Sequence, residues 1–529
     1  MNIRELIESR VKLNPNKVYL YFEDQEITYQ DFDTNINKAA NGFLRLGIQR
    51  GDHFAIMLPN SPEWLYSWFG LNKIGAVQAA VNIRLKGPEL HYILSHSDAK
   101  GIIISESYYP ILDSIRSSIS GLKHVIVVGG KKFNQADVIQ YESWLDGSSG
   151  ELQPVTISGK DPAILIYTSG TTGNPKGVLN SHGGWVLTGE CTAYMTGVSP
   201  EDRIITPNPL FHTMAQCYAV MSSLAANASL VLLEKFSRSQ LIEQTRRYGG
   251  SILILAAAAT PMFWSRPPQD DDGDNPVRVM QAGYVPRDYY DDFEIRFQLK
   301  IQTAYSLTET TVAVMAPREG VSPRKKTPGV GIVMEHPDPS FQNQVKIIDE
   351  TGAEAPRNRP GQFIVKNSAV MIGYYKNPEI TAETKKDGWI YTGDVGYQDE
   401  DGYFFFVGRS KDVLRRKGEL FSPAQVESVL NAHPKIEDSA VIGLPSDLGP
   451  GEDEVKAYVL PKSEESPSPQ EIIAWCSQRL ADFKVPRYIE FRTEFPRTPT
   501  SKIQKNILKA EKRDLTEGCY DREKEDPKP

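Results

Sequence analysis

The segment TSGTTGNPKG at 168–177 carries the side chains best suited to chemistry, directly after the apolar run ILIY. Its glycines allow backbone N–H groups to approach an anion closely, and its hydroxyls add further donors. Lys176 contributes a positive charge. The pattern predicts a polyphosphate-binding loop formed by Thr168, Ser169, Gly170, Thr171, Thr172, Gly173 and Lys176. It is not a Walker A loop, in which Gly-Lys-Ser/Thr opens a helix, because Pro175 precedes the lysine and Gly177 follows it.

Five further segments accompany this loop in chain order. They are NPLFHTMA at 208–215, AYSLTET at 304–310, YTGD at 391–394, GRSKDVLRRKGE at 408–419 and PRTPTSKIQK at 496–505. Together with the loop, they resemble the adenylate-forming superfamily of acyl-CoA synthetases, peptide-synthetase adenylation domains and firefly-type luciferases. The resemblance covers nearly the whole chain and leans toward the carnitine/crotonobetaine-CoA ligase-like branch. It implies a reaction that uses ATP, Mg²⁺ and CoA.

The resemblance places AYSLTET against the nucleotide. Tyr305 would stack on adenine, Thr308 would lie near the α-phosphate and Glu309 would hold Mg²⁺. The chemistry agrees, because Mg²⁺ on phosphates commonly takes one or two carboxylates and water molecules. Taken alone, a Thr-Glu pair is also typical of a helix start.

Three residues nearer the carboxyl end complete the implied nucleotide site. Asp394 of YTGD would bind the ribose hydroxyls with help from Arg409, although the tetrapeptide alone is also typical of a turn. Lys502 corresponds to the family's mobile lysine, which bridges the carboxylate and the α-phosphate during adenylation. Its ammonium would contribute roughly 3 to 4 kcal/mol, by analogy with one oxyanion donor. Ser501 stands where the family usually has glycine, and in isolation Lys502 would be an ordinary surface lysine.

GRSKDVLRRKGE corresponds to the family's hinge and thiol tunnel. Lys411 lies where the small domain would rotate, exposing one half-reaction at a time. Lys417, Gly418 and Glu419 would line the path of the CoA thiol, and Gly418 would leave room for the pantetheine beside bare backbone. A β-turn between two domains is equally compatible with these residues.

The acyl pocket implied by the resemblance contains His212, Thr213, Gly283, Tyr284 and Ser306. His212 would form a gate beside the carboxylate, although a lone histidine is also compatible with a structural role. No acid stands at 211–215, where amino-acid-activating relatives carry Asp, which disfavours an amino-acid substrate. The pocket has few large aliphatic side chains and therefore predicts a small or medium carboxylate.

The segment RVMQAGYVP at 278–286 departs most from the family, whose adenine-cradling loop is usually Gly-Gly-Ala-Pro. We expect Gln281, Ala282 and Gly283 to contact the adenine, and bulky Tyr284 to reshape the neighbouring acyl pocket. The residues expected to act directly in catalysis are Lys502, Glu309, Thr308 and His212.

Alternating helix and strand patterns must position these segments. A helix capped by Thr28 precedes the strand-like HFAIMLP, and a helix that starts at Ser61 precedes AVQAAV. The rhythm returns where ASLVLLE and SILILAA flank a helical stretch at 237–250. Such repeats predict a mixed or parallel sheet covered by helices.

The pattern changes after about residue 328. Short strands separated by turns, QVKIIDETG, GQFIVK and GYFFFVG, predict a small β-rich layer up to 408. A new α+β pattern follows, with helices at 423–432 and 471–483 and the strands DSAVIGL and EVKAYVL. The predicted fold is α/β: a large N-terminal domain of two helix-covered mixed sheets and a small β-rich layer, and a small mobile α+β C-terminal domain.

The resulting domain prediction has four parts. They are an ATP- and acyl-binding domain of three subdomains at 1–408, a hinge at 409–412, a mobile domain at 413–513 and a charged tail at 514–529. The tail is expected to be solvated, and the acidic run QDDDGDN at 269–275 is expected to be an exposed loop without a metal.

Length, composition and charge exclude several classes. A chain of 529 residues is too long to fold around a single hydrophobic core, since domains commonly hold about 100 to 200 residues. Hydrophobic residues are 40% and charged residues 24%, as in ordinary globular proteins. The 59 Lys and Arg against 67 Asp and Glu give a net charge of −8, which argues against a nucleic-acid partner.

The sequence also predicts the cellular compartment of the protein. No secretory signal opens it, and the apolar run ILILAAAA at 252–259 is shorter than the roughly 20 residues of a membrane span. Its 4 cysteines show no CxxC spacing, which fits a reducing cytosol. We expect a cytoplasmic protein without a membrane span.

The leading hypothesis is an AMP-forming carboxylate–CoA ligase whose partners are a small-molecule carboxylate, ATP and CoA. The alternative is a stand-alone adenylation enzyme that loads an acyl group onto a carrier protein. A luciferase-like oxygenase and a nucleotide sensor without activity are less favoured, since a sensor would not need Lys502. A homodimer is compatible with all of these.

Overall fold

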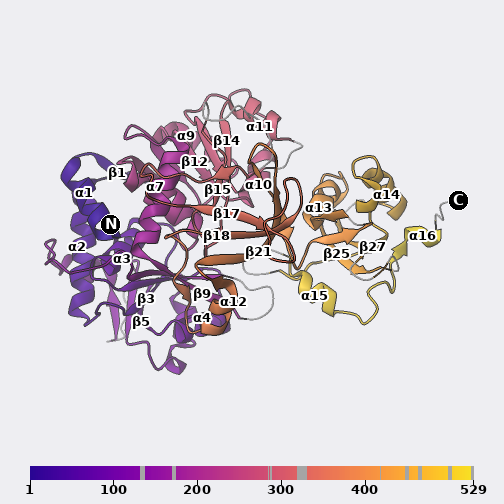
Figure 1. Cartoon of the computed structure of the whole chain (residues 1–529). Helices are drawn as coiled ribbons and strands as arrows, with labels where there is room; N and C mark the ends of the chain where they lie inside the picture. The colour runs from indigo at the N-terminus through magenta and orange to yellow at the C-terminus, as the bar shows by residue number, and fades with distance from the viewer. Residues whose placement is uncertain are drawn as a thin grey trace. The chain divides into compact units, whose positions relative to one another are not determined.

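The computed structural model describes residues 1–130, 137–168, 174–283, 285, 289–318, 330–417, 419–446, 449, 452–462, 467–497 and 503–525. The chain divides into two compact units. The first consists of Met1–Gly170, Asn174–Val345 and Ile364–Tyr391, and the second chiefly of Lys346–Phe363 and Thr392–Pro529. Figure 1 shows the chain and labels many of its helices and strands.

The first unit contains an eight-stranded sheet in the order β19-β9-β8-β4-β3-β5-β6-β7. Its strands are β3 (His53–Met57), β4 (Val77–Ala80), β5 (Ala99–Ser105), β6 (His124–Val128), β7 (Val138–Gln140), β8 (Pro162–Thr168), β9 (Lys176–Ser181) and β19 (Gly373–Tyr374). The pairs from β8 to β7 are parallel, whereas β9 runs antiparallel to both β8 and β19. The reversal at β9 places the ends of the predicted phosphate loop on neighbouring strands.

A second, nine-stranded sheet has the order β16-β15-β14-β13-β12-β10-β11-β1-β2. Its strands are β1 (Val18–Phe22), β2 (Gln25–Thr28), β10 (Arg203–Thr206), β11 (Ser229–Leu232), β12 (Ile252–Leu255), β13 (Val279–Ala282), β14 (Lys300–Tyr305), β15 (Val314–Met315) and β16 (Ile332–Val333). The five pairs from β1 to β14 are parallel. The carboxyl ends of β13 and β14 therefore lie together and carry Gly283 and Ser306.

Helices of the first unit cover these sheets. They are α1 (Ile3–Leu13), α2 (Tyr29–Arg45), α3 (Pro62–Lys73), α4 (Gly87–His96), α5 (Tyr109–Asp113), α6 (Tyr141–Asp146), α7 (His182–Thr196), α8 (Ser222–Ala225), α9 (Leu241–Tyr248), α10 (Ala259–Trp264), α11 (Tyr290–Phe297) and α12 (Pro378–Thr384), with short turns η1 (Arg116–Ser118) and η2 (Met214–Met221). The Thr28 and Ser61 side chains cap α2 and α3 as predicted. One apolar core joins the sheets and contains Phe54 of β3, Trp185 of α7 and Ile204 of β10.

Most of the acidic run at 269–275 is exposed as expected, and Asp272 is the exception. Asp272 is buried and forms ion pairs with Arg266 and, at 2.7 Å, with Arg296. Its burial follows from these partners, because a carboxylate leaves water only where cations and hydrogen bonds replace the solvent.

A five-stranded sheet follows in the order β17-β18-β21-β20, with β22 paired to β21. Its strands are β17 (Gln344–Ile348), β18 (Gly361–Lys366), β20 (Lys385–Lys386), β21 (Trp389–Gln398) and β22 (Phe404–Arg409). It is the predicted β-rich layer, and the boundaries between the two units fall within it.

The remainder of the second unit is the small α+β part. A hairpin, β23 (Leu414–Arg416) and β24 (Glu419–Phe421), precedes a four-stranded sheet of β25 (Ile436–Pro445), β26 (Asp453–Pro461), β27 (Tyr488–Phe491) and β28 (Tyr520–Asp521). The helices are α13 (Pro423–Asn431), α14 (Pro469–Ser477), α15 (Lys505–Ala510) and α16 (Arg522–Glu525), with a short turn, η4 (Asp482–Lys484). The predicted α/β fold with a large N-terminal and a small C-terminal part is confirmed.

Two details of this part differ from expectation. The helix expected at 471–483 ends at Ser477, because the backbone at Ala481 is extended and interrupts it. Part of the tail expected to be solvated packs on the domain: β28 pairs with β27, and Asp521 is buried against Arg487, whereas Glu523 and Lys524 are exposed. Among the described residues, we find no helix that combines the length and apolar character needed to cross a membrane.

Candidate active site

The predicted phosphate loop joins β8 to β9. Ser169, Gly170, Thr171, Thr172 and Gly173 lie outside the described residues. Thr168 and Lys176, at the ends of the loop, face each other as antiparallel partners. The Lys176 ammonium lies over the ring of Tyr374 of β19, 4.9 Å from its centre. Both ends of the loop are therefore fixed by strand pairing.

A second loop, residues 306–313, follows the carboxyl end of β14. The hydroxyl of Tyr374 donates a hydrogen bond of 2.8 Å to Glu309 Oε1. Thr308 Oγ1 lies 3.0 Å from Thr213 Oγ1. The structure thus brings together five polar residues from distant parts of the sequence: Lys176, Thr213, Thr308, Glu309 and Tyr374.

Backbone contacts hold this second loop in place. Asn180 Nδ2 donates to the Thr308 carbonyl at 3.3 Å, and the Met371 N–H donates to the Glu309 carbonyl at 2.9 Å. Thr311 has a φ of 50°, unusual for a β-branched residue, and its hydroxyl lies 2.9 Å from that of Thr188. Such support positions Thr308 and Glu309 before a ligand arrives, as a catalytic group requires.

Tyr218 supports the same loop from η2, a π-helical turn at 214–221. Its hydroxyl donates to the Thr311 carbonyl at 3.3 Å and lies 2.9 Å from Ser306 Oγ. Burial raises the pKa of Tyr218, so the hydroxyl stays protonated and able to donate. The π-helical turn widens the helix by one residue and is frequent at functional sites.

His212, Thr213 and Ser306 of the predicted acyl pocket lie next to η2 or in the loop at 306–313. His212 is exposed just before η2, with its ring centre 4.6 Å from that of Phe211. The Thr213 hydroxyl contacts that of Thr308, and the Ser306 hydroxyl contacts that of Tyr218. Gly283 follows β13, and Tyr284 lies outside the described residues.

Two of the predicted adenine-loop residues, Gln281 and Ala282, are buried in β13, whereas Gly283 follows the strand and is partly buried. Tyr305 at the end of β14 is also buried. The Gln281 amide contacts the hydroxyl of Thr196 and donates to Gln302 Oε1 at 3.2 Å. Because that side chain faces the interior, only the backbone of Gln281 is left for a nucleotide. Ala282 beside it is fully buried.

In the second unit, Asp394 and Arg409 form a cross-strand pair between β21 and β22. Arg409 Nε lies 3.0 Å from Asp394 Oδ1, and Arg409 Nη1 donates to the Thr392 carbonyl at 3.2 Å. The Asp394 carboxylate is buried. A guanidinium therefore holds this carboxylate in one orientation, as the ribose-binding prediction requires.

The predicted hinge and thiol residues follow β22. Lys411 is exposed in a turn, and Lys417 has a φ of 54° with its ammonium 2.9 Å from Asp482. Glu419 opens β24 and pairs with Arg416 across the hairpin. Gly418 and Lys502 lie outside the described residues.

A magnesium ion fits Glu309 as part of a nucleotide complex. Among the described residues, no group of three or more His, Cys, Asp or Glu is placed to hold a metal. Glu309 is a single, partly exposed carboxylate oriented by Tyr374. One carboxylate suffices where phosphates and water supply the other ligands.

Comparison with known proteins identifies the family. A model of AMP-binding enzymes matches residues 7–375, and a model of the AMP-binding enzyme C-terminal domain matches residues 425–502. The chain belongs to the AMP-binding enzyme family.

Relatives of this AMP-binding enzyme match it over nearly its whole length. The crotonobetaine/carnitine–CoA ligase of Salmonella typhimurium is 33% identical over 521 residues, 96% of this chain and 99% of that protein. The anthranilate CoA ligase AuaEII, solved with anthranoyl-AMP, is 28% identical with a TM-score of 0.84 over 97% of each chain. A benzoate CoA ligase from Burkholderia xenovorans LB400, 21% identical, has the same fold, with a TM-score of 0.82 over 96% of this chain and 99% of that one.

These comparisons confirm the predicted family and the enzyme class, an AMP-forming acid–thiol ligase. They favour CoA over a carrier protein as the acyl acceptor.

Tyr374, Asn180 and Tyr218 are residues that the sequence analysis missed. Tyr374 comes next to Lys176 only through the pairing of β19 with β9, for which sequence spacing gives no signal.

Proposed function

We propose that this AMP-binding enzyme joins a small or medium carboxylic acid to CoA in two half-reactions. The observation that best supports the proposal is the cluster of Lys176, Tyr374, Glu309, Thr308 and Thr213. It gathers a cation, a carboxylate and hydroxyl groups beside the ends of the glycine-rich loop.

In the first half-reaction, a substrate carboxylate oxygen attacks the α-phosphorus of ATP. A P–O bond forms, the bond to the bridging oxygen breaks and pyrophosphate leaves. Lys176 and the loop hydroxyls hold the phosphates, Thr308 contacts the α-phosphate, and Asp394 with Arg409 binds the ribose. Lys502 offsets the charge that builds on phosphorus. Mg²⁺, which Glu309 would hold, neutralises phosphate charge when bound.

In the second half-reaction, the CoA sulfur attacks the acyl carbon. A C–S bond forms, the C–O bond to AMP breaks, and the thiol proton leaves to solvent. Lys417, Gly418 and Glu419 line the path of the thiol, and Lys411 is the hinge between the two steps. A cytoplasmic location and a homodimer are compatible with this proposal and rest on the sequence alone.

We propose a small or medium acid because of the polar groups at the expected acyl pocket. Thr213, Ser306 and the Tyr218 hydroxyl lie on the two segments expected to form this pocket, η2 with the residue before it and the loop at 306–313. His212 is exposed beside them. A long fatty chain would need a larger apolar surface. The relatives named for carnitine, anthranilate and benzoate act on acids in this size range.

The test is pyrophosphate and AMP release from ATP over a panel of short, branched, hydroxy, aromatic and betaine acids, each with and without CoA. We expect full turnover to require one class of acid together with CoA. Acid-dependent pyrophosphate exchange without any effect of CoA would contradict the CoA ligase. If no acid in the panel causes release of pyrophosphate or AMP, adenylation itself would be contradicted.

A further inference from the structure

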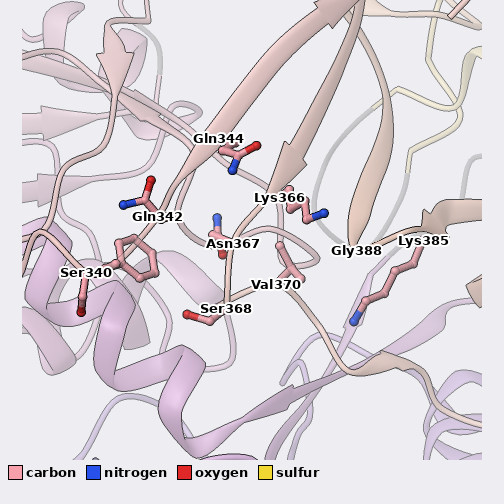
Figure 2. A pocket seen from close by; sticks show the side chains of 10 residues that line it. Ser340, Gln342, Gln344, Lys366, Asn367, Ser368, Val370, Lys385 and Gly388 are labelled. Carbon is pink, nitrogen blue, oxygen red and sulfur yellow. The ribbon is translucent and has the colours of Figure 1, made fainter.

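A groove of about 500 Å³ lies in the first unit, and none of the residues predicted for the active site lines it. Residues that line it include Gln342, Gln344, Lys366, Asn367, Ser368 and Lys385. Figure 2 shows the two lysines on one side of the groove and Gln342 on the other. We propose that this groove binds a small molecule that carries a phosphate group.

The charge of the groove favours an anion. Its lining contains two lysines, amides and hydroxyls but no carboxylate. In the described part of the chain, neither Lys366 nor Lys385 lies within ion-pair distance of an Asp or Glu side chain, although many other lysines do. Two unneutralised ammonium groups in a chain of net charge −8 are a local positive site.

Lys385 is held by the protein rather than by solvent. Its ammonium donates to the Met371 carbonyl at 2.8 Å, and two donors remain for another partner. Burial lowers the pKa of Lys385, which means that the fold places this charge at some cost. An anion at Lys385 would offset that cost.

Lys366 is positioned by two neighbours. Its ammonium lies over the ring of Trp389, 5.9 Å from the centre. Gly388 has a φ of 82°, and a Cβ there would come within 3.2 Å of Lys366 Cε. Glycine at 388 therefore leaves the space that the lysine stem occupies.

The segment that carries Lys366 and Ser368 is fixed by Asn367. Its amide donates to the Val312 carbonyl and to Asn343 Oδ1, each at 2.9 Å, and its oxygen accepts from the Ala369 N–H at 2.8 Å. The Ser368 hydroxyl next to it is exposed. The segment thus presents a hydroxyl donor beside a positioned cation, a combination that binds phosphate.

The size and lining exclude other ligand classes. The volume suits a metabolite, since small-molecule sites commonly span about 300 to 1,000 Å³. A metal ion would meet two lysine ammonium groups and no carboxylate, and an apolar ligand would find only Phe341 and Val370. Two sources of phosphate remain, a free phosphate or pyrophosphate and the phosphates of a nucleotide.

The test uses the full-length protein with its nucleotide site saturated by a non-hydrolysable ATP analogue. Calorimetry would measure the binding of inorganic pyrophosphate and, separately, of adenosine 3′,5′-bisphosphate. We compare the wild type with Lys366→Gln/Lys385→Gln and with the control Lys386→Gln. Lys386 is an exposed neighbour outside the groove. Circular dichroism and thermal melts verify that each variant folds.

We expect the wild type and Lys386→Gln to bind at least one probe equally well. The double variant should bind it about ten-fold more weakly or worse, as loss of a charge-assisted hydrogen bond implies. The tighter probe identifies the source of the phosphate. No binding of either probe to the wild type, or equal binding by the double variant, would overturn the proposal. Neither result depends on CoA ligase activity.

Discussion

Glu309 and Tyr374 form a hydrogen-bonded pair whose members have different expected roles. Replacing Glu309 by Gln should lower the rate of adenylation by roughly a hundred-fold or more, because one preorganised charge is lost from the transition state. The variant should also need more Mg²⁺ to reach its maximal rate. Acid-dependent pyrophosphate release, measured over a series of Mg²⁺ concentrations, checks both effects.

Tyr374→Phe is the matched control for that change. It removes only the donor to Glu309 Oε1 and leaves the carboxylate in place. We expect a smaller loss than in Glu309→Gln, roughly ten-fold, since a hydrogen bond to a charged group contributes about 1.5 to 3 kcal/mol. An unchanged Mg²⁺ requirement in Glu309→Gln would contradict the metal role.

Asp394 is expected to bind ATP rather than to stabilise the fold. Its partner Arg409 is 48% exposed, so water can replace the carboxylate when Asp394 is changed to Asn. ATP should bind roughly ten- to hundred-fold more weakly, and the melting temperature should change little. Calorimetry with ATP and a thermal melt give the two values. A large drop in melting temperature with unchanged ATP affinity would reverse this assignment.

His182 makes stability depend on pH. It is fully buried at the start of α7, and neither ring nitrogen has a hydrogen-bond partner among the described residues. Burial lowers the pKa of His182 from 6.5 to about 4. The unfolded chain therefore takes up a proton below pH 6.5 that the folded chain accepts only near pH 4.

The stabilisation from neutral His182 is full above pH 6.5 and is lost as the pH falls toward 4. It amounts to roughly 3 kcal/mol. Urea unfolding at pH 7 and pH 4.5 should show a smaller difference in His182→Gln than in the wild type. Equal differences would mean that other histidines, not His182, set the pH dependence.

At this scale, residue type and spacing predicted Thr168 and Lys176 as phosphate-loop residues, whereas Thr308, Glu309 and Asp394 became candidates only through the family resemblance. Residue type and spacing were insufficient for Tyr374 and Tyr218, whose positions depend on strand pairing and on a π-helical turn. They also could not show that the Gln281 side chain faces inward. Its direction follows from its partners Thr196 and Gln302.

Among the elements, the hairpin of β23 and β24 is tied to the end of the chain by buried charges. Arg416 is buried and lies 2.8 Å from Glu454 Oε2 and 3.5 Å from Glu523. Arg487 lies 3.1 Å from Asp521 and 3.7 Å from Glu454. Glu454 thus holds both arginines.

Glu454→Gln should destabilise this part of the chain by roughly 3 to 5 kcal/mol, because it leaves buried arginines without their shared carboxylate. Glu517→Gln, an exposed change in the same unit, should shift stability by less than about 0.5 kcal/mol. Urea unfolding followed by circular dichroism measures both. Equal effects would show that the network contributes nothing specific.

Element prediction succeeded where a cap or an apolar period was present, as in α2, α3 and α13. It failed where tertiary contacts decide the outcome. The chain at 514–529 is polar and has no apolar period, yet Asp521 and Glu523 find arginine partners on the folded domain. Asp272 is a second example, since Arg266 and Arg296 explain its burial.

At the scale of the whole molecule, two variants should separate the half-reactions. Lys502→Ala should abolish adenylation and leave thioester formation from supplied acyl-adenylate largely intact. Gly418→Val should do the reverse, because a side chain would fill the path of the thiol. Both residues lie outside the described residues, so the expectation rests on the resemblance.

Pyrophosphate release and thioester formation, assayed separately on each variant, test this division. Equal loss of both halves in Lys502→Ala would contradict the lysine assignment. Normal thioester formation in Gly418→Val would contradict the thiol path.

The family and fold were predictable because six motifs occur in order over nearly the whole chain. The identity of the acid was not predictable, because the proposed acyl pocket combines segments that are distant in sequence.

The π-helical turn at 214–221 has an evolutionary consequence. A π-helix differs from an α-helix by one inserted residue, so a single codon deletion there would restore α-helical geometry. The deletion would rotate every later side chain of the turn, including Tyr218, away from Ser306 and Thr311. Because Ser306 belongs to the proposed acyl pocket, we expect a one-codon insertion or deletion here to change acid preference without replacing any of the residues proposed to contact ATP.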